Sequence, residues 1–174
     1  MSVLRMLLVF TFAAFWSCQS AALEQNVTAV SRDGNTLVLT TDKGQVRVRF
    51  YTTEAVEVFY QPTGVNQLDS FAINADAGNL PLKLAMVNTG HAVRFSSADL
   101  RVQIDKSPLK IRFIKDGKTL LSENAGLQIG QGQRGFSFDL QPQQKLMGTG
   151  QRVLGMNRRG FKLPLYNKAS YGYT

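Results

Sequence analysis

The sequence predicts an all-β fold, an antiparallel β-sandwich, on the strength of two observations. Apolar and polar side chains alternate from residue 23 to about residue 147, and Asp-Gly turn signals separate the alternating runs. Antiparallel strands with one solvated face alternate in this way, and Asp-Gly pairs suit tight turns because glycine accepts a positive φ. A chain of 174 residues has room for one such domain.

The alternating runs are the candidate strands, and each places its apolar residues on one face. In residues 45–50, for example, Val46, Val48 and Phe50 share one face while Arg47 and Arg49 occupy the other. The stretch from 61 to 90 contains two prolines and three glycines and is predicted to be the loosest part of the domain. The predicted strands are residues 27–31, 36–41, 45–50, 100–105, 109–113 and 136–140.

The N-terminus has the pattern of a targeting segment. Arg5 precedes a run, residues 6–16, that is apolar except for Thr11. At about 1.5 Å per residue this run is too short to cross a hydrocarbon core of about 30 Å. Small residues follow it, so residues 1–22 are predicted to be a secretory signal peptide and residues 23–174 the exported domain. The alternative is a lipid anchor at Cys18, which would make the protein an outer-membrane lipoprotein.

Composition excludes several classes of site. A single Cys and a single His exclude a disulfide framework and argue against a histidine-ligated metal centre or a Ser-His-Asp triad, so we expect no metal site and no cofactor. Residues 130–135 fit G-x-G-x-x-G, but strand alternation follows them and no acid lies beyond Asp139. A dinucleotide site needs a helix and an acid there, so we interpret the motif as a loop between strands.

No pair of acids in this chain is predicted to catalyse glycoside hydrolysis, which needs two carboxylates. All twelve acids lie between Glu24 and Asp139, mostly at turns or on polar strand faces. Glu54 and Glu57 are close in sequence, but Glu57 lies between two valines and is predicted to face solvent. His91 follows Gly90 at a strand entrance and is interpreted as a turn residue.

The C-terminal segment has a different composition. Residues 140–174 contain six Lys or Arg and no acid, interleaved with aromatic residues. Burying unpaired charge is costly, so we expect the segment to lie against an acidic, concave partner and not against its own domain. Export argues against a nucleic acid as that partner. The residues are Lys145, Arg152, Arg158, Arg159, Lys162 and Lys168, with Phe161, Tyr166, Tyr171 and Tyr173.

The same segment contains three motifs in order: Lys-Leu-Met-Gly-Thr-Gly-Gln-Arg at 145–152, Met-Asn-Arg-Arg-Gly at 156–160 and Leu-Pro-Leu-Tyr-Asn-Lys at 163–168. Together they resemble the end of the N-terminal domain of glycoside hydrolase family 31. Upstream, residues 107–113 and Asp116-Gly117-Lys118 are similar to paired strands and a turn of that domain. The chain departs from the family pattern at Met147, Gln151 and Tyr166, where the family has an aromatic residue, Glu and Trp.

The resemblance implies a galactose-mutarotase-like sandwich that precedes a catalytic (β/α)₈ barrel. It implies retaining chemistry on α-1,4-glucan oligosaccharides, by hydrolysis or glucosyl transfer, with both catalytic aspartates in the barrel, so this chain alone should not catalyse. It implies that Asn167, Tyr171 and Tyr173 line the substrate entrance, and we expect Arg158 and Arg159 to pair with barrel acids. The rival hypothesis is a stand-alone carbohydrate-binding sandwich.

Overall fold

The computed structural model describes residues 24–66, 80–130, 133–150 and 153–164. All regular elements in these ranges are β-strands. None of the described segments is a helix long and apolar enough to cross a bilayer. The predicted signal peptide with Cys18, and the predicted entrance residues Asn167, Tyr171 and Tyr173, lie outside the described residues.

The first sheet is a four-stranded antiparallel meander in the order β1-β2-β3-β4. The β1–β2 turn contains Gly34 at φ 53°, as the Asp-Gly signal predicts. Between β2 and β3, Gly44 approaches the Gln61 carbonyl of β4 so closely that a Cβ would not fit. The strands are β1 (Val27–Asp33), β2 (Thr36–Thr41), β3 (Gly44–Phe50) and β4 (Val56–Pro62).

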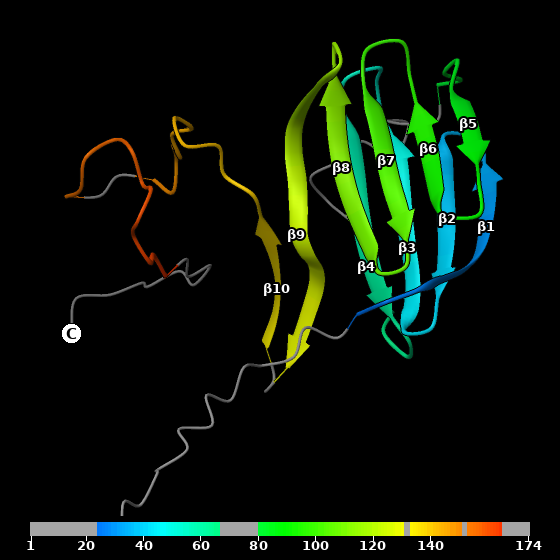
Figure 1. Ribbon diagram of the computed structural model, residues 1–174, viewed down its shortest axis with the longest axis horizontal. Helices are drawn as coiled ribbons and strands as arrows, with labels where there is room; N and C mark the ends of the chain where they lie inside the picture. The colour runs from blue at the N-terminus through cyan, green and yellow to red at the C-terminus, as the bar shows by residue number, and fades with distance from the viewer. Residues whose placement is uncertain (1–23, 67–79, 131–132, 151–152, 165–174) are drawn as a thin grey trace, which may run out of the picture.

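The second sheet has six antiparallel strands in the order β10-β9-β8-β7-β6-β5. Figure 1 shows the first sheet packed behind β5 to β8, while β9 and β10 extend the larger sheet beyond the smaller one. The all-β sandwich is therefore confirmed. The strands are β5 (Ala85–Asn88), β6 (Ala92–Ser96), β7 (Arg101–Lys106), β8 (Leu109–Lys115), β9 (Lys118–Gly130) and β10 (Gln133–Phe138).

The core lies between the two sheets and is built from the alternating positions that the sequence indicates. On β3, Val46, Val48 and Phe50 are buried, and the ring of Phe50 meets Phe95 of β6 edge-on at 5.3 Å. Such a pair joins the two inner faces and stabilises more than its buried area alone. The other fully buried side chains come from β2, β6, β7 and β8: Leu37, Leu39, Val93, Val102, Ile104 and Ile111.

The strands that the prediction did not list include β5 and β9. β5 lies inside the stretch that was predicted to be loosest, and the long β9 has no simple alternation. The reason is that β9 changes partner along its length: it pairs with β8 as far as Ser122 and with β10 from Glu123 to Gly130. A strand that changes neighbours and carries a bulge does not keep one buried face, so its sequence loses the period of two.

At Gly126 the backbone of β9 lies close to Leu109 at the start of β8. Its φ is 63°, and a Cβ there would lie 2.6 Å from the Leu109 carbonyl oxygen. We expect Gly126→Ala to lower the free energy of unfolding by about 2 kcal/mol. The cost of a positive φ for alanine adds to the cost of the clash between its Cβ and the Leu109 carbonyl oxygen. Gly117→Ala is the matched control, since Gly117 has φ 73° but open space around it. If urea denaturation gives the same loss of unfolding free energy for Gly126→Ala and Gly117→Ala, the contact with the Leu109 carbonyl does not contribute to the loss.

Candidate functional site

The candidate interaction surface is the segment that follows β10, residues 140–164. Its described residues, 140–150 and 153–164, form irregular loops that stand off from the sandwich (Figure 1, yellow to orange). Four of the six predicted cations lie in its described part, namely Lys145, Arg158, Arg159 and Lys162. The described part contains no acid, so its own side chains provide no counter-ion.

Arg158 is at the centre of this segment, and its side chain is engaged there. The residue is only 8% exposed. Its Nε donates to the Gly148 carbonyl at 3.2 Å, Nη2 to Gly150 at 3.2 Å, and Nη1 to Leu154 and Gly155 at 2.9 and 2.5 Å. The sequence predicted that the cations avoid the protein's own interior, and the burial of Arg158 differs from that expectation. Its guanidinium can be buried because four carbonyl oxygens replace the water around it. Pairing of Arg158 with barrel acids stays a prediction.

Arg159 is exposed and lies beside Arg158 on the same turn. Its Nη1 donates to the carbonyls of Gln141 and Gln144 at 2.7 and 3.1 Å. Its backbone N–H donates to the Asn157 Oδ1, which also accepts from the Leu146 N–H. Arg159 therefore ties the start of the segment to the turn while its side chain remains at the surface, so its predicted pairing with a barrel acid stays a prediction.

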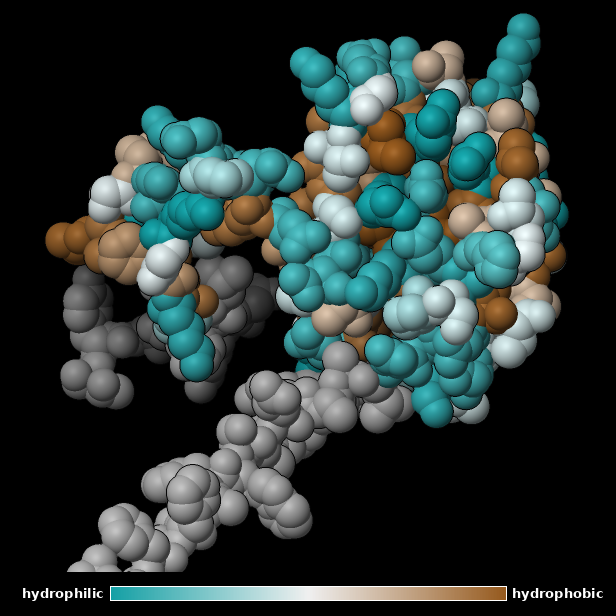
Figure 2. Space-filling model, in the orientation of Figure 1, coloured by the Kyte–Doolittle hydropathy of each residue, from teal (hydrophilic) through white to brown (hydrophobic). Residues whose placement is uncertain are grey.

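The segment also exposes an unusual amount of apolar surface. Val153 is fully exposed, Met156 is 72% exposed and Met147 is 58% exposed. Figure 2 shows brown, apolar atoms at the end of the segment that lies farthest from the sandwich, next to teal polar ones. Apolar residues that gather on a surface in this way, interleaved with charge, mark sites of protein–protein contact. The remaining exposed apolar residues of the segment are Leu146, Leu154 and Phe161.

A buried carboxylate lies at the junction of the two sheets, and the sequence analysis did not single it out. Glu123 of β9 is 6% exposed and accepts hydrogen bonds from the Tyr60 hydroxyl at 2.9 Å and from the Ile111 N–H at 2.8 Å. Burial raises the pKa of Glu123, against the opposing effect of these hydrogen bonds. Burial and the neighbouring carboxylate raise the pKa of Tyr60. No signal in the sequence distinguishes Glu123 from the surface acids.

The ring of Tyr60 connects this buried pair to the edge of the larger sheet. The ring of Phe136 on β10 packs against Tyr60 at an interplanar angle of 48°, with ring centroids 5.0 Å apart, yet 47% of Phe136 is exposed. The inner face of β10 lies beyond the smaller sheet, which explains why an aromatic residue in an inward position stays partly uncovered.

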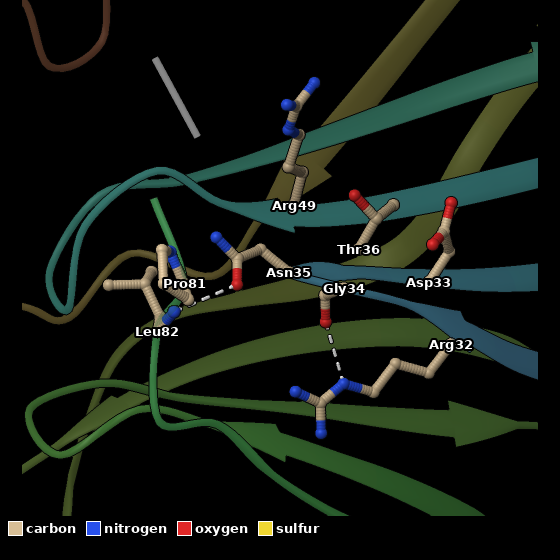
Figure 3. A pocket seen from close by; sticks show the side chains of 8 residues that line it. All are labelled: Arg32, Asp33, Gly34, Asn35, Thr36, Arg49, Pro81 and Leu82. Atoms are coloured by element: carbon tan, nitrogen blue, oxygen red, sulfur yellow. Dashed lines mark hydrogen bonds between the residues drawn. The ribbon is translucent and has the colours of Figure 1, made fainter. Parts of the chain in front are cut away.

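A polar cavity of about 540 Å³ lies at the β1–β2 turn. Figure 3 shows Arg32 and Asn35 on its walls, each directed toward a backbone partner. Arg32 donates to the carbonyls of Gly34 and Leu84, and Asn35 bonds the Leu80 carbonyl and the Leu82 N–H. These bonds hold residues 80–84 against the first sheet, so Arg32 and Asn35 have structural roles. The lining residues are Arg32, Asp33, Gly34, Asn35, Thr36, Arg49, Pro81 and Leu82.

The acids close in sequence do not form a catalytic pair. Glu54 binds Lys115 at 2.5 Å, and Glu57 accepts from the Tyr51 hydroxyl at 3.0 Å. Glu57 is half-buried by this contact, although it lies on the outer face as predicted. Where the chain is described, no three His, Cys, Asp or Glu side chains gather as metal ligands.

The glycine-rich motif at 130–135 joins two strands. β9 ends at Gly130 and β10 begins at Gln133, and Gly130 and Gln133 face one another across the hairpin. The described residues of the motif, Gly130 and residues 133–135, belong to these two strands, and no helix follows it directly. The motif therefore lies at a connection between strands, as the sequence predicts, and not before the helix that a dinucleotide site needs.

Comparisons with solved structures agree with this fold. The dextranase of Flavobacterium johnsoniae, a family 31 enzyme in complex with isomaltotriose, matches with a TM-score of 0.68 and 22% identity over 80% of this chain. The cycloalternan-forming enzyme of Listeria monocytogenes, in complex with a pentasaccharide substrate, matches with a TM-score of 0.60 and 21% identity over 79% of this chain. At this identity the likeness shows the fold. No curated protein sequence matches the chain.

The chain corresponds to a small part of these proteins, since the match covers 18% of the dextranase and 14% of the cycloalternan-forming enzyme. The family model described as the glycosyl hydrolase 31 N-terminal galactose mutarotase-like domain matches residues 22–174, which is most of the chain. The motifs at 145–152 and 156–160 fall within this match, as does the whole sandwich. The chain therefore belongs to the family of glycosyl hydrolase 31 N-terminal galactose mutarotase-like domains.

Proposed function

We propose that this chain is the non-catalytic N-terminal domain of a longer, exported enzyme that acts on α-glucosidic bonds with retention of configuration. The observation that carries the proposal is the family match over residues 22–174 in a chain that spans less than a fifth of its structural neighbours. Two of those neighbours are a dextranase with isomaltotriose and a cycloalternan-forming enzyme with a pentasaccharide. The signal-like residues 1–22 support export.

In this proposal, the residues that catalyse the reaction lie in the (β/α)₈ barrel of the longer enzyme and not in this domain. Retaining glycoside hydrolysis or transfer uses two carboxyl groups about 5–5.5 Å apart, one as nucleophile and one as acid and then base. Glu54 and Glu57, the two acids that lie close in sequence, are engaged by Lys115 and by the Tyr51 hydroxyl and not by each other. The sandwich supports the barrel, and the exposed Arg159 faces a barrel acid.

The chain also contributes a loop to the substrate entrance in this proposal. Asn167, Tyr171 and Tyr173 lie near the end of the acid-free basic segment, residues 140–174. Tyrosine rings can lie against the apolar faces of glucose units, while the asparagine amide exchanges hydrogen bonds with hydroxyl groups. These three residues would bind the glucan and position it, without taking part in bond cleavage.

The experiment is an assay of the full-length gene product with maltooligosaccharides and isomaltooligosaccharides. We expect release or transfer of glucose from maltooligosaccharides, with the α-anomer formed first in a proton NMR time course. Tyr171→Ala should raise KM about tenfold with a smaller change in kcat, because the ring binds substrate and transition state alike. A full-length product without α-glucoside activity, or maltooligosaccharide binding by residues 23–174 alone in titration calorimetry, would favour the stand-alone carbohydrate-binding module instead.

A further inference from the structure

We propose that the outer face of the larger sheet, here named the basic face, binds the anionic headgroups of a phospholipid bilayer. The proposal goes beyond the proposed function, and it depends on neither the substrate nor the activity of the longer enzyme. The basic face consists of outward side chains of β6, β7 and β8: Arg94, Arg101, Gln103, Asp105, Lys110 and Arg112.

The period of two along these strands places the charges on one side of the sheet. Val93 and Phe95 of β6 are fully buried in the core, so Arg94 between them faces outward. The same alternation turns Arg101 of β7 and Lys110 of β8 away from the core. Figure 1 looks onto this outer side, with the smaller sheet behind it, and Figure 2 shows in the same orientation that hydrophilic side chains predominate there.

The strand register spreads the cations over two dimensions. Arg94 pairs with Gln103, and Gln103 pairs with Arg112. Because neighbouring strands lie about 4.8 Å apart, the backbones at Arg94 and Arg112 are separated by about 10 Å across the sheet. Arg101 lies two residues from Gln103 along β7, and Lys110 lies two residues from Arg112 along β8, which is about 7 Å in each case. The cations therefore form a flat array and not a single line.

The basic face has an excess of positive charge. Its one acid, Asp105, is bound by the Arg112 Nη2 at 2.9 Å, so this pair is close to neutral. Among the described residues, no ion pair involves Arg94, Arg101 or Lys110. Three cations without an acidic partner in the described sandwich attract an anionic surface, and their field extends about 10 Å at 0.1 M salt.

The chemistry of the basic face favours a bilayer over a glycan or a nucleic acid. None of its side chains is aromatic, so it lacks the rings on which sugars and single-stranded bases stack. A bilayer presents its anionic groups in a plane, and each Lys or Arg near that plane adds to the attraction. Val87 of β5 pairs with Arg94 and is 50% exposed, so an apolar side chain that can enter the headgroup region borders the cations.

Vesicle binding by the full-length gene product tests the proposal, with co-sedimentation as the readout. Residues 1–22 are removed so that a lipid anchor cannot contribute. At about 0.05 M salt, binding to vesicles of equimolar phosphatidylglycerol and phosphatidylcholine should be at least about tenfold tighter than binding to phosphatidylcholine alone. It should be lost at about 1 M salt, where the Debye length falls to about 3 Å. Equal binding to the two kinds of vesicle, or no binding to either, overturns the proposal.

Two double variants test whether the basic face mediates this binding. Arg94→Gln with Arg101→Gln removes two of the three cations and should weaken binding to the anionic vesicles about thirtyfold. Arg94→Lys with Arg101→Lys keeps both charges and should bind as the unmodified protein does. Loss of binding in this charge-conserving variant would contradict an electrostatic contact.

The matched control is Lys145→Gln with Lys162→Gln, which removes the same charge from two exposed positions after β10. This control should bind the anionic vesicles as the unmodified protein does, and a loss equal to that of the arginine variant would overturn the assignment to β6, β7 and β8. Tighter binding of the unmodified protein to double-stranded DNA than to the anionic vesicles, at the same salt, would overturn the bilayer as the partner. No substrate is present, so an inactive product that binds the vesicles would reject the proposed function and retain the basic face.

Discussion

Phe95→Ala is expected to lower the free energy of unfolding of the sandwich by about 4 kcal/mol, because it removes a large, fully buried side chain and leaves a cavity. Phe95 lies on β6 with no exposed surface, and its ring meets Phe50 of the opposite sheet at 5.3 Å. The guanidinium of Arg32 lies over the same ring at 5.5 Å. One substitution therefore removes the aromatic contact between the sheets and part of the support of residues 80–84.

Phe138→Ala is the matched control for this prediction. Phe138 lies on the edge strand β10 and is 41% exposed, so its truncation leaves no closed cavity and should cost about 1 kcal/mol. Phe95→Leu should lie between the two, since it keeps most of the buried volume. The measurement is urea denaturation followed by circular dichroism. If Phe95→Ala and Phe138→Ala cost the same, the core between the sheets is not what stabilises the sandwich.

The strands that the sequence predicts best are those with a solvated face. In β3 the alternation of Val46, Val48 and Phe50 with arginines follows directly from the pleat of a half-exposed strand. β9 could not be predicted in this way, because Glu123 turns inward to accept the Ile111 N–H where β8 and β9 part. A strand distant in sequence determines that orientation, so the residues next to Glu123 in the sequence do not indicate it.

The candidate site, too, could be predicted from the sequence only in part. Family motifs located the basic segment, and composition showed that it lacks acids. The sequence could not show that Arg158 binds carbonyls of its own loop while the adjacent Arg159 stays exposed. Two neighbouring arginines have the same charge and the same composition around them, and only the path of the backbone distinguishes the roles of their side chains. The assignments at Asn167, Tyr171 and Tyr173 stay predictions.

Replacement of Glu123 is the second large effect that we expect. Glu123→Ala removes the acceptor of both the Ile111 N–H and the Tyr60 hydroxyl, and it should lower the free energy of unfolding by about 3 kcal/mol. Glu123→Gln keeps an oxygen for the N–H and should lose about 1 kcal/mol. Asp105→Asn, at a half-exposed acid that binds Arg112, is the control and should change stability by less than about 1 kcal/mol. A loss in Glu123→Ala no larger than in Asp105→Asn would contradict a structural role for the buried carboxylate.

The pH dependence of stability gives an independent test of the same group. Burial raises the pKa of Glu123 above its ordinary value of 4.5, so the folded state holds this proton more tightly than the unfolded state. The contribution of Glu123 is therefore complete below about pH 4.5 and is lost as pH rises through the folded-state pKa. Asp42 acts in the opposite sense, because the Asn26 backbone N–H lowers the pKa of its carboxyl below 3.8, and its contribution is lost as pH falls.

Comparison of the unmodified protein with Glu123→Gln separates these two effects, since Asp42 is present in both. The unmodified protein should lose stability relative to the variant as the pH rises above about 4.5, measured as the urea midpoint at constant ionic strength. A difference that stays constant over this range would mean that Glu123 titrates in the folded protein as it does in the unfolded chain. Because the Tyr60 hydroxyl donates to the same carboxylate, Tyr60→Phe should extend the loss of stability to higher pH. Without that donor the ionised form of Glu123 is less stabilised, and its pKa rises further.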